Sequence, residues 1–265
     1  MSVLSEQEIA TYERDGLVIP ADFRLSRERR DALHARVASV VVANPEIESD
    51  RLINVHLHGG APFGVQGDDA FFDLAREPAI LDMVSQLIGP DLILWSTHLF
   101  CKPAARGREV PWHQDGHYWP IRPLATCTVW VALDDVSVDN GALRYLPGSH
   151  RKGDYRHHAD DRPDVTLNQA IDEDQFDEAH ARYVELEAGQ MSLHDVHLVH
   201  GSAANTSGRR RAGLAMRYMP STSQLRRDLQ REVSMLDWTE MPIFLVRGEN
   251  RHAGNDLSVG LAAEA

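Results

Sequence analysis

Residues 126–150 read TCTVWVALDDVSVDNGALRYLPGSH, and this stretch decides the fold class. Two short runs rich in apolar and β-branched residues, 126–133 and 143–146, are separated by Asp, Ser, Asn and Gly, which favour turns. Similar runs recur on both sides, at 92–100, 183–186 and 211–219. Short strands with irregular connections are typical of an antiparallel sandwich or barrel. We therefore expect a mainly β structure from about residue 91 onward.

The N-terminal third carries helical signals instead. Ser5 and Glu8 have the spacing of a capping box. Residues 26–43 place apolar side chains on one stripe, and a further helix is expected to begin at Pro78 and to end at Gly89. The chain is thus expected to form one domain, with a helical lead-in over 1–90 and a barrel core over 91–220. The C-terminal segment, 221–265, is expected to contain a helix over 224–237.

Residues 150–182 differ from the rest of the expected barrel. They are polar and acidic, they contain four histidines (150, 157, 158 and 180), and no strand is evident in them. We interpret this segment as a long surface insertion in the barrel core, of the kind that often covers a site.

Composition excludes several classes of function. The 265 residues carry a formal net charge of −13, which argues against a nucleic-acid partner because such a protein needs a basic face. No apolar run is long enough to span a membrane. The N-terminal residues lack the apolar core of a secretory signal, and the two cysteines do not form a disulfide framework. We expect a cytoplasmic protein with a small-molecule partner. Whether the protein forms a homo-oligomer stays open.

The fourteen histidines raise the question of a metal site. In PWHQDGHY, residues 111–118, His113 and Asp115 are two residues apart, so on an extended segment both side chains leave the same face. The run LHDVHLVHGS, residues 193–202, supplies a third ligand. Two histidines and one carboxylate suit non-haem Fe(II) and leave coordination positions for a cosubstrate and O2. Arg211, eleven residues after His200, offers a planar fork that can hold the distal carboxylate of a 2-oxo acid.

Three blocks together identify a family resemblance: PWHQDGHYWP, TVWVALDDVSVDNGALRYLPGSH and GQMSLHDVHLVHGSAANTSGRRRAGLAMRY. With FCKP and the helical lead-in they cover roughly residues 10–220. The sequence resembles the phytanoyl-CoA dioxygenase family of Fe(II)- and 2-oxoglutarate-dependent oxygenases. That resemblance implies a double-stranded β-helix, a jelly-roll barrel of the cupin type with flanking helices.

The resemblance also implies roles for individual residues. His113, Asp115 and His200 match the iron ligands, because only His200 of the three histidines in its run has the HGS context. Arg211 and Ser202 match the residues that bind the 2-oxoglutarate carboxylate. Trp130 matches an aromatic residue that lines the 2-oxoglutarate pocket, and His98 matches a further contact with the cosubstrate. Asn54 is the last of the implied cosubstrate contacts. Some members of the family have a lysine near this position. The presence of Asp115 points to hydroxylation, because related halogenases lack this carboxylate.

Five further residues are candidates for contact with the substrate: Tyr118, His117, Lys102, His56 and Arg217. Tyr118 and His117 follow the metal motif and are expected near the pocket. Lys102 suits an anionic group, although a solvated loop lysine is the favoured interpretation. His56 is expected in the pocket wall and His58 at the surface. Arg217 shares a strand face with Arg211, so it needs either an interior carboxylate or a ligand.

The sequence therefore predicts an Fe(II)- and 2-oxoglutarate-dependent dioxygenase that hydroxylates an aliphatic carbon and releases succinate and CO2. A small polar metabolite is the expected substrate, of the amino acid, amine or phosphonate type. Two alternatives stay open. One is a tailoring oxygenase that acts on a larger natural product or an acyl compound. The other is a non-catalytic jelly-roll module with a structural metal, although structural zinc usually has four protein ligands.

Overall fold

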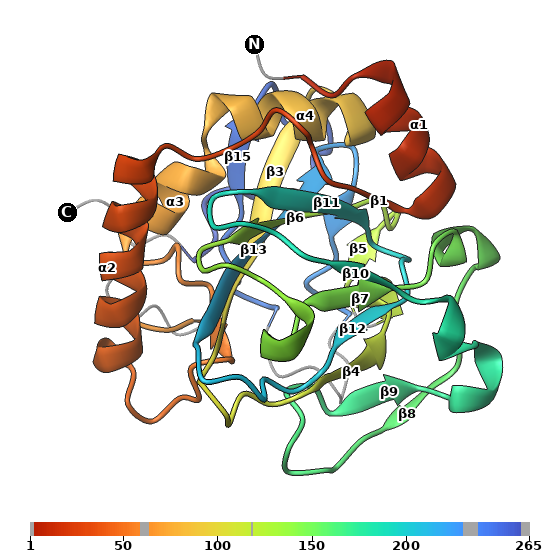
Figure 1. Cartoon of the computed structure of the whole chain (residues 1–265). Helices are drawn as coiled ribbons and strands as arrows, with labels where there is room; N and C mark the ends of the chain where they lie inside the picture. Colours follow the sequence, from red (N-terminus) through yellow and green to blue (C-terminus); the bar gives the residue numbers. More distant parts are fainter. Residues whose placement is uncertain (1–2, 59–63, 118, 230–237, 261–265) are drawn as a thin grey trace.

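Two antiparallel sheets face each other in the computed structural model of the chain (Figure 1). The structure describes residues 3–58, 64–117, 119–229 and 238–260. The larger sheet has the strand order β1 (Leu17–Val18), β11 (Met191–Asp195), β6 (Cys127–Ala132), β13 (Arg211–Pro220), β3 (Leu92–Lys102) and β15 (Phe244–Arg247), with β2 (Leu52–Ile53) also paired to β3. The smaller sheet has the order β10 (Arg182–Val184), β7 (Leu143–Tyr145), β12 (His200–Ser202) and β4 (Val110–His113). This is the expected double-stranded β-helix.

Four described helices cover the outer face of the larger sheet: α1 (Glu6–Asp15), α2 (Arg27–Ala43), α3 (Asp69–Ala75) and α4 (Pro78–Ile88). The capping box of Ser5 and Glu8 is present, and α4 begins at Pro78 as expected. Apolar residues of these helices, such as Val37 and Ile80, form one core with the outward-facing side chains of β6, β11 and β13. The helices therefore bury one face of this sheet and leave the other face toward the barrel interior.

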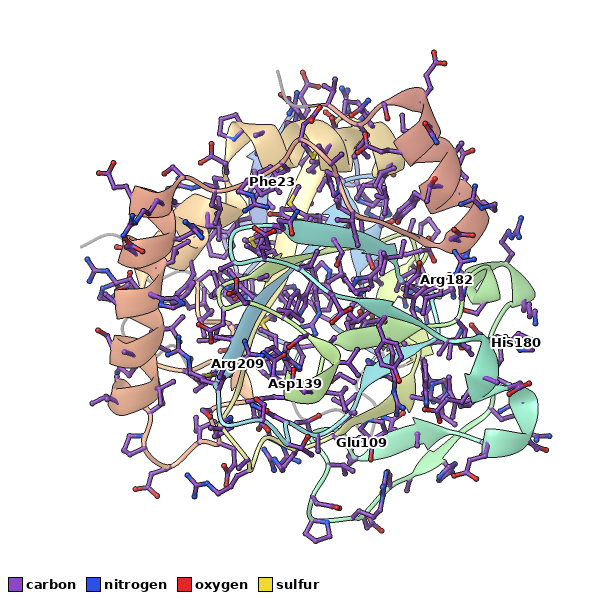
Figure 2. The ribbon with its side chains drawn as sticks, in the orientation of Figure 1. Phe23, Glu109, Asp139, His180, Arg182 and Arg209 are labelled. Atoms are coloured by element: carbon purple, nitrogen blue, oxygen red, sulfur yellow. The ribbon has the colours of Figure 1, made fainter. Side chains whose placement is uncertain are left out.

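Alternation along the strands determines which side chains enter that interior. On β13, Ala212, Leu214 and Met216 belong to the core beneath the helices, whereas Ala215 packs inside the barrel beside Trp130. Arg211, Gly213 and Arg217 share the inward face of Ala215, because side chains alternate along a strand. Side chains fill the space between the two sheets, as Figure 2 shows.

An irregularity in β3 changes the alternation beside β13. Arg217 pairs with Ser96 and Tyr218 pairs with Leu94, so Trp95 has no opposite residue and forms a β-bulge. A bulge redirects the side chains next to it. In consequence Trp95 packs with Trp119 at one end of the barrel interior, next to Arg217.

Two expectations from the sequence are wrong in part. The segment 150–182 is not free of strands, because β8 (His157–Ala159) and β9 (Gln169–Ile171) form an antiparallel hairpin that lies against β4. Residues Gln224–Leu225 form strand β14, paired with β5 (Ile121–Arg122), and are not helical. Residues 230–237 of the expected helix lie outside the described part of the chain.

Surface ion pairs connect loops at the edge of the barrel. Asp139, in the turn before β7, lies 3.4 Å from Arg209, in the turn before β13, and Figure 2 labels both residues. Within the described residues, no helix is long and apolar enough to cross a membrane. That the whole chain forms a single domain stays a prediction.

Candidate metal and cosubstrate site

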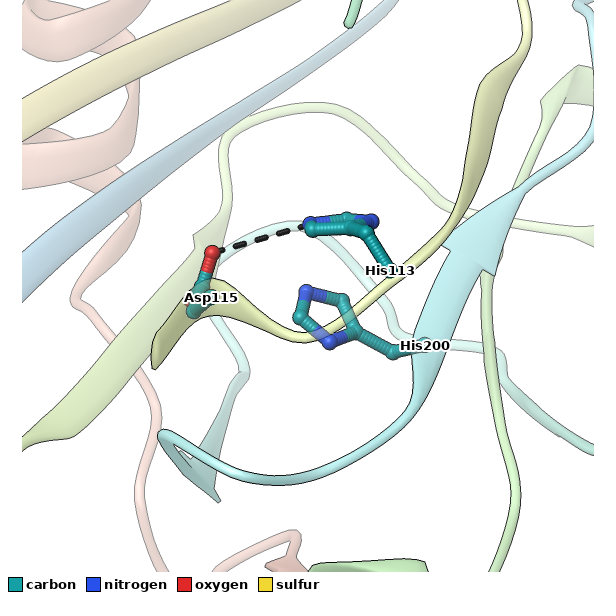
Figure 3. Close-up of side chains that lie close together, drawn as sticks. All are labelled: His113, Asp115 and His200. Atoms are coloured by element: carbon teal, nitrogen blue, oxygen red, sulfur yellow. Dashed lines mark ion pairs between the residues drawn. The ribbon is translucent and has the colours of Figure 1, made fainter. Parts of the chain in front are cut away.

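His113, Asp115 and His200 converge in the barrel interior (Figure 3). His113 ends β4 and His200 begins β12, and the two residues are direct partners in the smaller sheet. Asp115 begins the short 3₁₀ turn Asp115–His117 that follows β4. One possible ligand atom from each residue lies within 4.8 Å of the others, and all three side chains are buried. The sheet pairing thus brings together ligands that are far apart in the sequence.

Hydrogen bonds orient both imidazole rings for metal binding. Nδ1 of His113 lies 2.8 Å from the carbonyl oxygen of Pro111, and Nδ1 of His200 lies 2.9 Å from that of Leu198. A carbonyl can only accept, so Nδ1 carries the proton in each ring and Nε2 keeps its lone pair. This arrangement is typical of metal-ligating histidines. Burial, together with the neighbouring His113, lowers the pKa of His200 well below its usual value, which favours the neutral form that binds a metal.

The carboxylate of Asp115 is held by groups from three sides. Burial alone would raise its pKa, but contacts with His113 and His194 outweigh that effect, so the pKa lies well below its usual range. Oδ1 lies 3.6 Å from Nε2 of His113. Oδ2 lies 3.7 Å from Nε2 of His194 and accepts a hydrogen bond from Thr128 Oγ1 at 3.4 Å. The carboxylate is therefore charged and has one oxygen turned toward the ligand cluster.

Arg211 is a buried cation without an acidic partner among the described residues. Its NH2 group donates to the carbonyl oxygen of Gly141 at 2.8 Å, and its Nε has no partner. The guanidinium lies 5.4 Å from the ring centroid of Trp130. Burial lowers the pKa of Arg211 to about 10, so the residue stays charged at neutral pH. A buried, unpaired guanidinium suits an anionic ligand, and binding of the 2-oxoglutarate carboxylate by Arg211 stays a prediction.

Lys102 lies next to Arg211, and the interpretation of Lys102 as a solvated loop lysine is wrong. It ends β3, it is fully buried, and it pairs with Arg211 in the sheet. Its Nζ donates to Ser202 Oγ at 2.7 Å and to the carbonyl oxygen of Ala203 at 2.6 Å. Burial, and after it the charge of Arg211, lowers the pKa of Lys102 well below its usual value. Lys102 therefore lies at the end of the site where Arg211 and Ser202 lie.

One cavity joins these groups. Its polar lining includes the three ligand residues, Thr128, His194, Ser202, Arg211 and Arg217, and its apolar lining includes Phe100, Val110, Trp130, Leu143 and Leu167. Strand alternation can identify Thr128 and His194 as residues that line the cavity. Thr128 lies two residues before Trp130, and His194 lies on the adjacent strand. Leu167 comes from the insertion 150–182, and no pattern in the sequence places it at the cavity.

Two other candidates lie beside the cavity. His98 is buried, its ring stacks on Phe100 at 3.6 Å, and its pKa is lowered to about 3 by burial and by the charge of Arg217. Asn54 is fully buried and accepts a hydrogen bond from Ser96 Oγ at 3.0 Å. Neither side chain is among those that line the cavity, so a direct contact with the cosubstrate stays a prediction for both.

Two of the candidates for substrate contact lie elsewhere. His56 is not in the pocket wall: Nδ1 lies 2.9 Å from Thr97 Oγ1, and the ring packs against Phe72 and Phe244. His117 does not point into the cavity, because its ring stacks on His157 of the insertion at 3.9 Å. His58 is exposed, as expected. Tyr118 lies outside the described residues.

Comparison with known proteins agrees with this arrangement. The family model described as phytanoyl-CoA dioxygenase (PhyH) matches residues 2–213. The chain belongs to the phytanoyl-CoA dioxygenase family. The cofactors of this family are Fe(II) and 2-oxoglutarate, and the cluster of His113, Asp115 and His200 is a fitting metal site.

Several relatives illustrate the range of the phytanoyl-CoA dioxygenase family. Human peroxisomal phytanoyl-CoA dioxygenase is 35% identical over 155 residues, which cover 56% of this chain and 45% of the relative. A probable alpha-ketoglutarate-dependent hypophosphite dioxygenase of Stutzerimonas stutzeri is 32% identical over 154 residues, or 57% of this chain and 53% of the relative. The match thus spans about half the length of these two curated relatives. L-proline trans-4-hydroxylase of Streptomyces griseoviridis is 27% identical over 231 residues, or 78% of this chain and 83% of the relative.

A solved structure extends the likeness to most of the fold. The non-heme monooxygenase ThoJ in its apo form superposes with a TM-score of 0.71 at 29% identity, covering 91% of this chain and 84% of that one. Both the helical lead-in and the barrel therefore correspond to a known non-heme oxygenase.

Proposed function

We propose that this protein is an Fe(II)- and 2-oxoglutarate-dependent dioxygenase that hydroxylates an aliphatic carbon of a small polar metabolite, with release of succinate and CO2. The observation that carries the proposal is a single cavity in which the oriented ligands His113, Asp115 and His200 lie with the unpaired cation Arg211. A metal site and an anion site in one cavity suit a 2-oxo acid that is held at both ends.

Each residue of the site has a distinct task in this proposal. His113, Asp115 and His200 would hold Fe(II), which together with 2-oxoglutarate supplies the oxidising chemistry that activates O2. Arg211 and Ser202 would bind the distal carboxylate of 2-oxoglutarate. Trp130 forms a wall beside Arg211. The backbone carbonyls that accept from the two Nδ1 atoms keep the metal-binding nitrogens in place.

The relatives support a small substrate. L-proline trans-4-hydroxylase and the hypophosphite dioxygenase are both named for small polar compounds. A protein with a structural metal alone would not need the buried cation Arg211 next to the metal ligands, so the cavity favours an enzyme over a binding module.

The experiment that tests this proposal measures succinate formation from 2-oxoglutarate with Fe(II), ascorbate and O2, with and without a panel of small metabolites. We expect turnover with the unchanged protein and loss of at least a hundredfold in His113→Ala and in Arg211→Leu. His58→Ala, at an exposed histidine, is the matched control and should retain activity. No succinate with any compound, together with tight retention of zinc, would overturn the proposal.

A further inference from the structure

Arg217 is a second arginine of β13 that lines the metal cavity. Its side chain lies on the same strand face as Arg211, and it pairs with Ser96 of β3 and with Thr128 of β6. Nothing in the proposed binding of Fe(II) or 2-oxoglutarate uses this residue. The question is what its positive charge binds.

Within the described part of the chain, Arg217 has no carboxylate in ion-pair distance. Its only hydrogen-bond contact is with Ser96 Oγ at 3.5 Å, and its buried Nε has no partner. By contrast, Arg210, the residue just before β13, forms two hydrogen bonds with Asp134, at 2.9 and 2.8 Å. Among the described residues, this half-buried guanidinium of Arg217 therefore lacks a counter-ion.

Two indole rings hold the guanidinium of Arg217 in place. Its central carbon lies 5.1 Å from the ring centroid of Trp119 and 6.0 Å from that of Trp95, the residue of the β-bulge. Arginine stacks favourably on aromatic faces and keeps its N–H groups free for a ligand in the plane of the fork. The site is thus preorganised for an anion.

Arg217 cannot serve the same carboxylate as Arg211. Six residues separate them on one strand, which corresponds to about 20 Å along the chain. Trp130 and Lys102 lie near Arg211, whereas Trp119 and Trp95 lie near Arg217. The metal ligands therefore face two cationic ends of one cavity, and 2-oxoglutarate accounts for one of them.

We infer that the substrate carries a negatively charged group, a carboxylate or a phosphonate, that binds Arg217 on the side of the metal site away from Arg211. This inference rests on the proposed function and narrows its substrate class. Compounds with an acidic group, such as amino acids and small phosphonates, fit the site, whereas simple amines and uncharged scaffolds do not. The anion would place the remainder of a small molecule next to the metal ligands.

The test compares acids with their neutral counterparts in the protein loaded with Fe(II) and 2-oxoglutarate. The panel contains the free L-amino acids, each paired with its amide, and alkylphosphonates paired with their dimethyl esters. Succinate formation above the level without any addition is measured at increasing concentrations of each compound. We expect at least one acid to stimulate succinate formation. The KM for this acid should be at least tenfold lower than the KM for its neutral counterpart. The two arms show whether the anion is a carboxylate or a phosphonate.

Variants test whether the preference for an acid over its neutral counterpart depends on Arg217. Arg217→Gln should raise the KM for the stimulating acid at least tenfold and remove the preference over its amide, and Arg217→Lys should restore part of it. Arg210→Gln, whose partner is Asp134 at the protein surface, is the matched control. If amides stimulate as well as acids, if no acid stimulates, or if Arg217→Gln leaves the KM unchanged, the inference is overturned. Absence of succinate under all conditions would instead overturn the proposed function.

Discussion

At the scale of single residues, the site depends on basic side chains that no described carboxylate neutralises. Arg211, Arg217 and Lys102 all lie in or beside the cavity, and none has an ion pair with a described carboxylate at hydrogen-bond distance. Burial of Arg211 costs free energy in the empty protein, because its charge loses water without gaining a counter-ion among the described residues. Anionic ligands recover that free energy on binding, so we expect affinity for anions to be the main contribution of these residues.

Lys102 provides a first prediction. Its Nζ donates to Ser202 Oγ at 2.7 Å, beside Arg211 in the sheet. Lys102→Met removes this hydrogen bond, so the KM for 2-oxoglutarate should rise about tenfold, since a hydrogen bond contributes about 0.5–1.5 kcal/mol net. Steady-state kinetics with varied 2-oxoglutarate measure this change. Lys152→Met, at an exposed lysine, is the control, and an unchanged KM in Lys102→Met would contradict the role.

Gly213 provides a second prediction. A Cβ at this position would lie 1.9 Å from Cζ2 of Trp130, so Gly213→Ala must displace the indole or the strand. Overpacking of this kind costs about 1–3 kcal/mol. We expect a melting temperature several degrees lower and a higher KM for 2-oxoglutarate, because Trp130 lies beside Arg211. Gly208→Ala has open space for its Cβ and should match the unchanged protein in both measurements.

At the scale of elements, the insertion 150–182 is connected to the metal loop by one buried side chain. Gln114 lies between the ligands His113 and Asp115. Its Nε2 donates to the carbonyl oxygens of Gly153 and His197 at 3.0 and 2.7 Å, and its Oε1 accepts from the backbone N–H of Tyr155 at 2.8 Å. The position of the insertion and the position of the ligands therefore depend on each other.

Gln114→Ala should make the positions of the insertion and of the metal ligands less well fixed. We expect faster trypsin cleavage within 150–182, because the hairpin loses its hydrogen bonds to the metal loop, and about tenfold weaker metal binding, as is typical when support of a ligand is removed. Limited proteolysis and a metal titration followed by tryptophan fluorescence measure the two effects. Gln175→Ala is the control, since this glutamine bonds only to Arg156 within the insertion. If metal affinity falls without any change in cleavage, the proposed coupling is wrong.

The elements that the sequence predicts well are those with local signals. The capping box at Ser5, Pro78 at a helix start and the alternation over 211–219 each predict structure without reference to the rest of the chain. Short strands such as β8 and β14 were missed because their pairing partners, β9 and β5, supply the stabilising contacts. The spacing in the sequence also predicts that His113 and Asp115 lie close together. Their proximity to His200, in contrast, depends on the pairing of β4 with β12. Lys102 was misjudged because its burial comes from Ser202 and Ala203, about a hundred residues away.

At the scale of the whole molecule, the net charge of −13 and the cationic cavity have opposite signs. The acidic surface does not attract anions, so selection of an anionic ligand must come from short-range contacts within the barrel. We therefore expect the KM for 2-oxoglutarate to depend less on ionic strength than it would for a protein with a basic surface.

Stability of the whole fold should depend on pH through histidines that are buried in a neutral form. Burial lowers the pKa of His56 to about 3, whereas an unfolded histidine has a pKa of about 6.5. Between these two pH values the unfolded chain binds a proton that the folded chain does not bind, so the free energy of unfolding falls as the pH falls. For His56 alone the loss between pH 7 and pH 5 is about 2 kcal/mol.

This prediction is best tested with urea unfolding at pH 7 and pH 5 in the presence of a chelator, so that metal release makes no contribution. His56→Gln should reduce the difference in unfolding free energy between the two pH values by about 2 kcal/mol, whatever its stability at pH 7. His58→Gln, at the exposed histidine two residues away, should leave that difference unchanged. An equal difference in His56→Gln and in the unchanged protein would mean that His56 accepts a proton in the folded state. The packing of its ring against Phe72 and Phe244 would then not exclude the charged form.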